Sequence, residues 1–128
     1  MTDVITFTTS LPPRGCSPNR SDHWSGAYTA KRDYREEVWA DAAVAGASHL
    51  RWAAARISLT FGTHRRPGDG RYHPTDRDNA VASFKAGQDG IVDTGLIEDD
   101  AFAHLEIGEI VIDPTQYGVT IVLERIEE

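Results

Sequence analysis

The chain has 128 residues and a formal net charge of −7, with 40% hydrophobic and 26% charged residues, a composition typical of one globular domain with its own core. No apolar run approaches the roughly 20 residues of a membrane-spanning helix, and the first ten residues lack the basic and apolar regions of a secretion signal. The single cysteine, Cys16, excludes an internal disulfide. We therefore expect a cytoplasmic protein with no membrane partner.

Charge is divided unevenly along the chain. Residues 1–75 hold ten Lys/Arg against seven Asp/Glu, a balance of +3, whereas residues 76–128 hold three against thirteen, a balance of −10. The net charge alone argues against a nucleic-acid partner, but this asymmetry allows a basic surface beside an acidic one. The basic part includes Arg65, Arg66 and Arg71, which lie just before the acidic cluster.

In the first half of the chain, the pattern predicts a strand, a helix and a second strand. Residues 4–7 are β-prone, and the three prolines and one glycine of residues 11–20 then indicate a loop. Residues 31–45 place apolar side chains on one face at helical spacing, and Gly46 is expected to end that helix. Residues 57–61 alternate apolar and hydroxyl side chains, which is the pattern of a half-buried strand.

A turn-rich loop, residues 63–75, leads to a helix that we predict over residues 79–92. Gly87 and Gly90 each disfavour this helix by roughly 1 kcal/mol relative to alanine. Three residues before it are suitable N-caps: Thr75, Asp76 and Asp78.

Two strands are predicted to close the chain. Residues 106–113 form one strand with a bulge at Gly108, and residues 119–126 form the last strand, which pairs back as a hairpin after a turn at residues 113–118. The order strand, helix, strand, helix, strand, strand favours a single α/β domain over residues 1–128, with one small mixed sheet and helices packed against it.

Carboxylates cluster around the helix predicted over residues 79–92, with Asp76 and Asp78 before it and Asp99 and Asp100 after it. Capping or a surface turn explains any one of them, because aspartate satisfies free amides at helix starts. The set is harder to explain, since two unit charges about 4 Å apart repel by roughly 4 kcal/mol at an effective dielectric of 20. If the fold brings Asp100 near Asp76 and Asp78, a divalent cation would offset this repulsion, and oxygen ligands favour Mg²⁺ or Mn²⁺ over Zn²⁺.

Such a site would suit phosphodiester hydrolysis, because a bound divalent cation activates water and neutralises the charge that builds up at the phosphate. Lys85 is the only Lys or Arg between Arg77 and Arg125. It follows Asp78 by about two helical turns, so it could lie on the same side and complement that charge. A solvated helix lysine is the alternative interpretation of Lys85.

The string DRDNAVASFKAGQDGIVDTGLIEDD, residues 76–100, resembles the motif of the RusA-type crossover junction endodeoxyribonucleases, a family of phage and prophage enzymes that resolve Holliday junctions. The family pattern is Asp-x-Asp-Asn, a lysine and then an aspartate on the next helix, a small-residue turn, and Asp-Asp. The loop LPPRGCSPNR, residues 11–20, also resembles the family's opening loop, so the resemblance spans nearly the whole chain. The matching motif residues here are Asp76, Asp78, Asn79, Lys85, Asp89, Gly95, Asp99 and Asp100.

The resemblance implies a homodimer that uses Mg²⁺, or Mn²⁺, to cut four-way DNA junctions with paired symmetric nicks. It implies metal ligands at Asp76, Asp78 and Asp100, a catalytic or DNA-contacting lysine at Lys85, and a supporting, DNA-facing role for Asn79. The chain departs from the family at the lysine. In the best-known members it follows the second aspartate by four residues, whereas here that place is alanine and the lysine comes three residues later.

DNA binding by an acidic chain has to rely on its basic segments, since phosphate contacts dominate affinity. We expect these contacts from the loop that carries Arg65, Arg66 and Arg71, together with the N-terminal arginines.

Two other functions are compatible with the sequence. The same site could serve a nuclease for another branched DNA substrate or for duplex. An acidic small protein could instead mimic DNA and occupy a partner's binding groove without catalysis. A mimic predicts indifference to Mg²⁺, whereas a resolvase predicts metal-dependent nicks. A zinc site is disfavoured, because the five histidines lack the spacing of zinc ligands.

Overall fold

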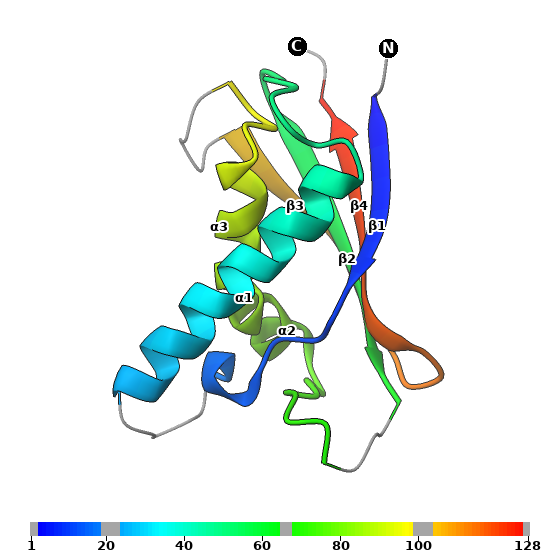
Figure 1. The fold of residues 1–128 in the computed structure, drawn as a ribbon. Helices are drawn as coiled ribbons and strands as arrows, with labels where there is room; N and C mark the ends of the chain where they lie inside the picture. The colour runs from blue at the N-terminus through cyan, green and yellow to red at the C-terminus, as the bar shows by residue number, and fades with distance from the viewer. Residues whose placement is uncertain (1–2, 19–23, 65–67, 99–103, 127–128) are drawn as a thin grey trace.

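The computed structural model describes residues 3–18, 24–64, 68–98 and 104–126, and its elements follow the predicted order (Figure 1). In the part of the chain that the structure describes, four strands form one mixed sheet with the helices on one face, which confirms the predicted α/β fold. None of the described helices is both long and apolar enough to cross a membrane. In chain order the elements are β1 (Val4–Thr9), the 3-10 turn η1 (Arg14–Cys16), α1 (Trp24–Val44), β2 (Ala55–Thr63), α2 (Arg77–Ser83), α3 (Lys85–Asp93), β3 (Leu105–Asp113) and β4 (Tyr117–Arg125).

The sheet has the order β1-β4-β2-β3, with β2 parallel to β3 and β4 antiparallel to both β1 and β2. Because β3 and β4 are not neighbours, the predicted hairpin between residues 106–113 and 119–126 is wrong. The connection between them passes over the end of β2 instead, where a Cβ on Gly62 would lie only 2.5 Å from the main chain of Gln116. The His64 N–H donates to the carbonyl of Gln116 at 2.9 Å. Gly62 therefore leaves room for the crossing, and β2 lies between the two strands that the turn joins.

The core lies between the sheet and the helices. The predicted alternation of β2 is confirmed, since its apolar residues are buried and the hydroxyl residues between them are partly exposed. The predicted bulge is also confirmed, because Gly108 and Glu109 of β3 together face Ser58 of β2. Three cross-strand pairs of buried side chains form the centre of the core: Ile57–Leu123, Leu59–Ile121 and Phe61–Val119.

The helix predicted over residues 79–92 is divided in two at Phe84. Phe84 has φ −91° and ψ 2°, outside the helical range, and its side chain is buried. Its ring makes edge-on contacts with the rings of Tyr34 and Phe61, whose centroids are 5.9 Å and 6.2 Å away. The helix is thus interrupted where this aromatic ring enters the core, a contact that periodicity alone does not reveal.

α1 begins at Trp24, earlier than the predicted residue 31, and ends at Val44. Gly46, with φ 102°, ends the helix as predicted, because its left-handed backbone is one that glycine adopts without strain. The unpredicted first turns pack on η1, where a Cβ on Gly15 would lie 2.5 Å from the Cβ of Ala30. Tertiary contact, rather than an apolar pattern, therefore accounts for the longer helix.

α1 and α3 pack closely because α3 presents glycine to α1. A Cβ on Gly90 would lie 2.3 Å from the carbonyl oxygen of Arg35 and 3.0 Å from the backbone nitrogen of Trp39. A Cβ on Gly87 would meet buried aromatic rings at 2.9 Å to 3.1 Å. The roughly 1 kcal/mol of helix propensity that each glycine sacrifices is therefore offset by close contact between the two helices.

Candidate functional site

The predicted metal ligands Asp76 and Asp78 lie at the start of α2, and both are exposed. Asp76 is the N-cap: its Oδ1 accepts a hydrogen bond from the backbone N–H of Asn79 at 2.9 Å, and its Oδ2 accepts one from Asn79 Nδ2 at 2.8 Å. This confirms the predicted capping role of Asp76. Asp78 lies in the first turn, where the positive end of the helix dipole favours a carboxylate. Asn79 thus orients one of two carboxylates that are both accessible from solvent.

The third predicted ligand, Asp100, lies outside the described residues, and so do the predicted DNA contacts Arg65 and Arg66. Within the part of the chain that the structure describes, no group of three or more His, Cys, Asp or Glu side chains is arranged to hold a metal ion.

The described residues that flank positions 99–103 are Glu98 and His104. Glu98 lies near the start of β2, because its N–H donates to the carbonyl of Trp52 at 2.9 Å, and His104 directly precedes β3. Asp76 instead follows the loop from the far end of β2. α2 and α3 therefore run between the end of the sheet nearest Asp76 and the end where β2 and β3 begin (Figure 1).

Lys85 is the first residue of α3, and its side chain is 56% exposed. Its Nζ donates to Asp89 Oδ1 at 2.7 Å, so the lysine and the aspartate of the sequence motif form an ion pair along one helical turn. Because the helix is interrupted at Phe84, Lys85 and Asp78 lie on separate helices. They are therefore not two turns apart on one continuous helix, as the sequence pattern had suggested.

Lys85 lines a cavity of about 560 Å³ between α1 and the α2–α3 segment, which we call the α1–α3 groove. Its floor includes the buried Cys16, whose thiol pKa is raised by burial. Among the described residues that line the groove, four are cationic and one, Asp89, is acidic. The cations are Lys31, Arg32 and Arg35 of α1 and Lys85 of α3, and the exposed Tyr28 lies among them.

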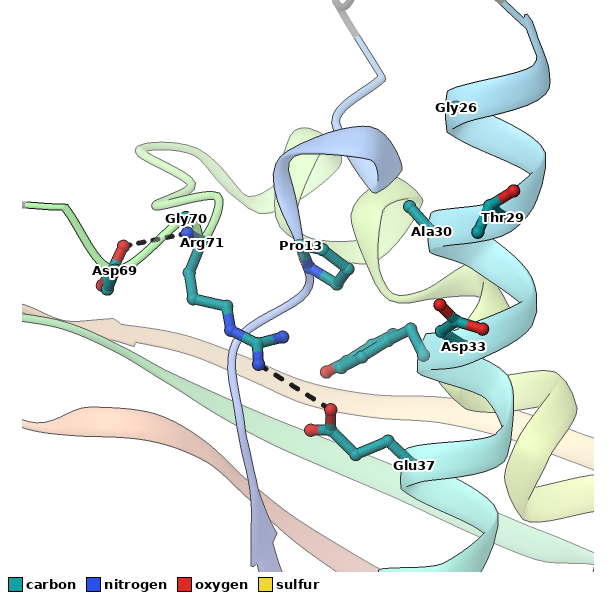
Figure 2. Close-up of a pocket in the computed structure, with 10 residues that line it drawn as sticks. Pro13, Gly26, Thr29, Ala30, Asp33, Glu37, Asp69, Gly70 and Arg71 are labelled. Carbon is teal, nitrogen blue, oxygen red and sulfur yellow. Dashed lines mark hydrogen bonds and ion pairs between the residues drawn. The ribbon is translucent and has the colours of Figure 1, made fainter.

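Arg71, the remaining predicted DNA contact, faces an acidic cavity of about 740 Å³ (Figure 2). Its Nη1 donates to the carbonyl of Leu11 at 3.2 Å, and its Nη2 lies 3.8 Å from Glu37 Oε1. Asp33, Glu37 and Asp69 line this cavity, and the backbone N–H of Arg71 holds the pKa of Asp69 below its usual value. Arg71 therefore joins the loop after β2 to α1 and to the segment after β1.

The flank of α1 that faces β1 is acidic. Asp33, Glu37 and Asp41 recur at every fourth residue, so they lie on one side of the helix. At the end of β1, the Thr9 hydroxyl donates to Asp41 Oδ2 at 2.7 Å. α1 thus carries an acidic flank toward β1 and a basic flank toward α3.

The basic flank of α1 is absent from the predicted site residues, although the sequence contains its signal. Tyr28, Arg32, Arg35 and Trp39 are spaced by four, three and four residues, which places them along one line of a helix. The prediction starts the helix at residue 31, so Tyr28 falls outside it and the line is not apparent.

No family model matches the chain, and no curated protein sequence matches it. The resemblance to RusA-type endonucleases therefore rests on the motif residues themselves.

Proposed function

We propose that this protein is a Mg²⁺-dependent endonuclease that resolves four-way DNA junctions, as its resemblance to RusA-type enzymes implies. The observation that carries the proposal is the pair of accessible carboxylates, Asp76 and Asp78, at the start of α2. Asn79 orients Asp76 through two hydrogen bonds. Carboxylate oxygens of this kind are the ligands that Mg²⁺ and Mn²⁺ prefer in proteins.

In this proposal Asp76 and Asp78 would hold the cation, with Asp100 as the third ligand that the resemblance implies. A cation bound there would activate water and neutralise charge at the scissile phosphate. Hydrolysis adds one water across a phosphodiester bond, leaving a phosphate monoester on one side of the nick and a hydroxyl on the other. Lys85, which donates to Asp89 in the structure, would instead donate to the reacting phosphate. That exchange is energetically accessible, because an exposed ion pair contributes at most about 1 kcal/mol.

Two opposed nicks are needed to resolve a junction, so a symmetric homodimer with one acidic site per subunit suits the reaction. Such an enzyme acts where the DNA is, in the cytoplasm of a bacterial host. This agrees with the location expected from a chain with a single cysteine.

The test is cleavage of a synthetic four-way junction with each strand labelled in turn, in Mg²⁺ and in EDTA. We expect symmetric nicks in opposed strands that require Mg²⁺ and disappear in Asp78→Asn. Glu36→Gln is the matched control, because it removes the same charge from an exposed position on α1.

Flap and linear duplex substrates in the same assay distinguish a resolvase from a nuclease of another specificity. Preferential cutting of a flap would change the assigned substrate but would leave the assignment of the active-site residues unchanged. Failure to cut any substrate in Mg²⁺ or Mn²⁺ would overturn the proposal and favour a DNA mimic.

A further inference from the structure

The α1–α3 groove brings together four described cations of this acidic protein. Lys31, Arg32 and Arg35 line it from α1, and Lys85 lines it from α3. Asp89 is the one acidic side chain among the described lining residues. Exposed charges interact over roughly 10 Å at 0.1 M salt, so the field at the groove depends on these cations and on the carboxylates paired with them more than on the net charge of −7.

Aromatic side chains accompany these cations along the same line of α1. Tyr28 is 63% exposed and Trp39 is 46% exposed, which is unusual for side chains of this size in a helix that also packs on a core. Arginine and lysine beside an exposed aromatic is the combination with which proteins hold the backbone and bases of nucleic acids.

Three of the four described cations of the groove form ion pairs, and the pair between α1 and α3 also holds the groove in shape. Arg35 makes a two-pronged pair with Asp93 of α3, at 2.6 Å and 2.8 Å, which holds one wall against the other. Arg32 pairs with its neighbour Asp33, at 3.3 Å, and both side chains are more than half exposed. Such exposed pairs contribute at most about 1 kcal/mol, so a phosphate can replace the carboxylate. Lys31 is exposed as well.

The position of the groove relative to α2 connects it to the carboxylates. Ala82 and Ser83, at the end of α2, line the groove, while Asp76 caps the start of the same helix. α2 has seven residues and is therefore about 10 Å long. One DNA strand can thus extend from the groove to the carboxylates.

We propose that the α1–α3 groove binds the phosphate backbone of DNA and leads a strand along α2 toward Asp76 and Asp78. The identity of the DNA as a four-way junction rests on the proposed function, whereas the binding surface rests on the charge and shape of the groove. The groove adds a DNA contact to the one expected from the loop that carries Arg65, Arg66 and Arg71, in which Arg71 lies beside carboxylates of its own chain.

The test compares two double charge reversals. Lys31→Glu with Arg32→Glu changes the groove, and Arg56→Glu with Arg125→Glu is the matched control. Both control arginines form exposed pairs away from the groove, with Glu106 and Asp3. Binding to a fluorescent four-way junction and to a duplex is measured by anisotropy in EDTA at several salt concentrations, after circular dichroism has shown that both variants are folded. If a reversal unfolds the chain, Lys31→Gln with Arg32→Gln and the corresponding control replace it.

We expect the groove variant to bind at least about tenfold more weakly and to lower the slope of log affinity against log salt by about 2, since each phosphate contact contributes about 0.9. The control should retain the parental slope. Equal affinities and salt slopes for the two variants, or a parental protein that binds no DNA, would refute DNA binding by the groove. A parental protein that binds DNA through the groove but never cuts it would support the groove as a DNA-binding site and refute only the proposed function.

Discussion

Substitution of Gly90 by alanine should destabilise the protein, although alanine is the better helix former. A Cβ at this position would lie 2.3 Å from the carbonyl oxygen of Arg35, whereas an ordinary contact needs about 3.4 Å. The obstruction is main chain, so no side-chain rotation relieves it, and α1 has to move about 1 Å away from α3. Overpacking of this kind costs about 1–3 kcal/mol, and the gain in helix propensity returns about 1 kcal/mol.

Gly26→Ala is the matched control for this prediction. Gly26 also lies in a helix, but a Cβ there would meet nothing within 4 Å, so its substitution should stabilise the protein by up to about 1 kcal/mol. Urea unfolding followed by circular dichroism gives the free energy of unfolding of both variants. We expect Gly90→Ala to be less stable than Gly26→Ala by about 2 kcal/mol. Equal stability would refute the close packing of α1 on α3.

Three other outcomes follow from the described contacts. Asp76→Asn should keep the helix cap and the parental stability, whereas Asp76→Ala should lose about 1 kcal/mol of stability in urea unfolding. Under the proposed function both variants should lose junction cleavage. An Asp76→Asn protein that still cleaves junctions would contradict the metal-ligand role of Asp76. Under the proposed function, Lys85→Ala should lower the single-turnover rate of cleavage by about 10²-fold, with partial rescue by Lys85→Arg, and a parental rate would identify a solvated lysine. The same substitution should change stability by less than about 0.5 kcal/mol, because the pair of Lys85 with Asp89 is exposed. Burial raises the pKa of the Cys16 thiol, so this thiol should alkylate slowly at pH 8 in the folded protein and rapidly in urea. The stability that burial of the neutral thiol provides should be complete below the unfolded pKa of about 8.5 and should fall as the pH rises through the higher folded pKa. Equal alkylation rates in the two conditions would rule out a buried thiol.

The types and order of the elements could be predicted because they depend on local properties of the chain. Alternation of apolar and hydroxyl side chains is sufficient to specify β2 as a half-buried strand. A carboxylate three residues before an available backbone amide is sufficient for the cap at Asp76, and a glycine in the left-handed region ends α1 near Gly46. Each of these features concerns residues that are neighbours in sequence.

Strand order and the break at Phe84 could not be predicted, because both depend on residues far apart in sequence. The turn after β3 has the composition of a hairpin turn, and nothing in it indicates that β2 lies between β3 and β4. That arrangement becomes possible because Gly62 leaves space for the main chain of Gln116. The helix break likewise reflects the packing of Phe84 against the ring of Tyr34.

The candidate site likewise has one part that could be predicted from the sequence and one part that depends on tertiary packing. The motif identified the exposed carboxylates of α2, which lie within a few residues of one another. It did not identify the groove, because an isolated helix exposes every flank to water. Burial of Tyr34 and Val38 orients α1 so that its acidic residues face β1 and its cations face α3. The charges are encoded in the sequence, but packing against the sheet and α3 separates them into two surfaces.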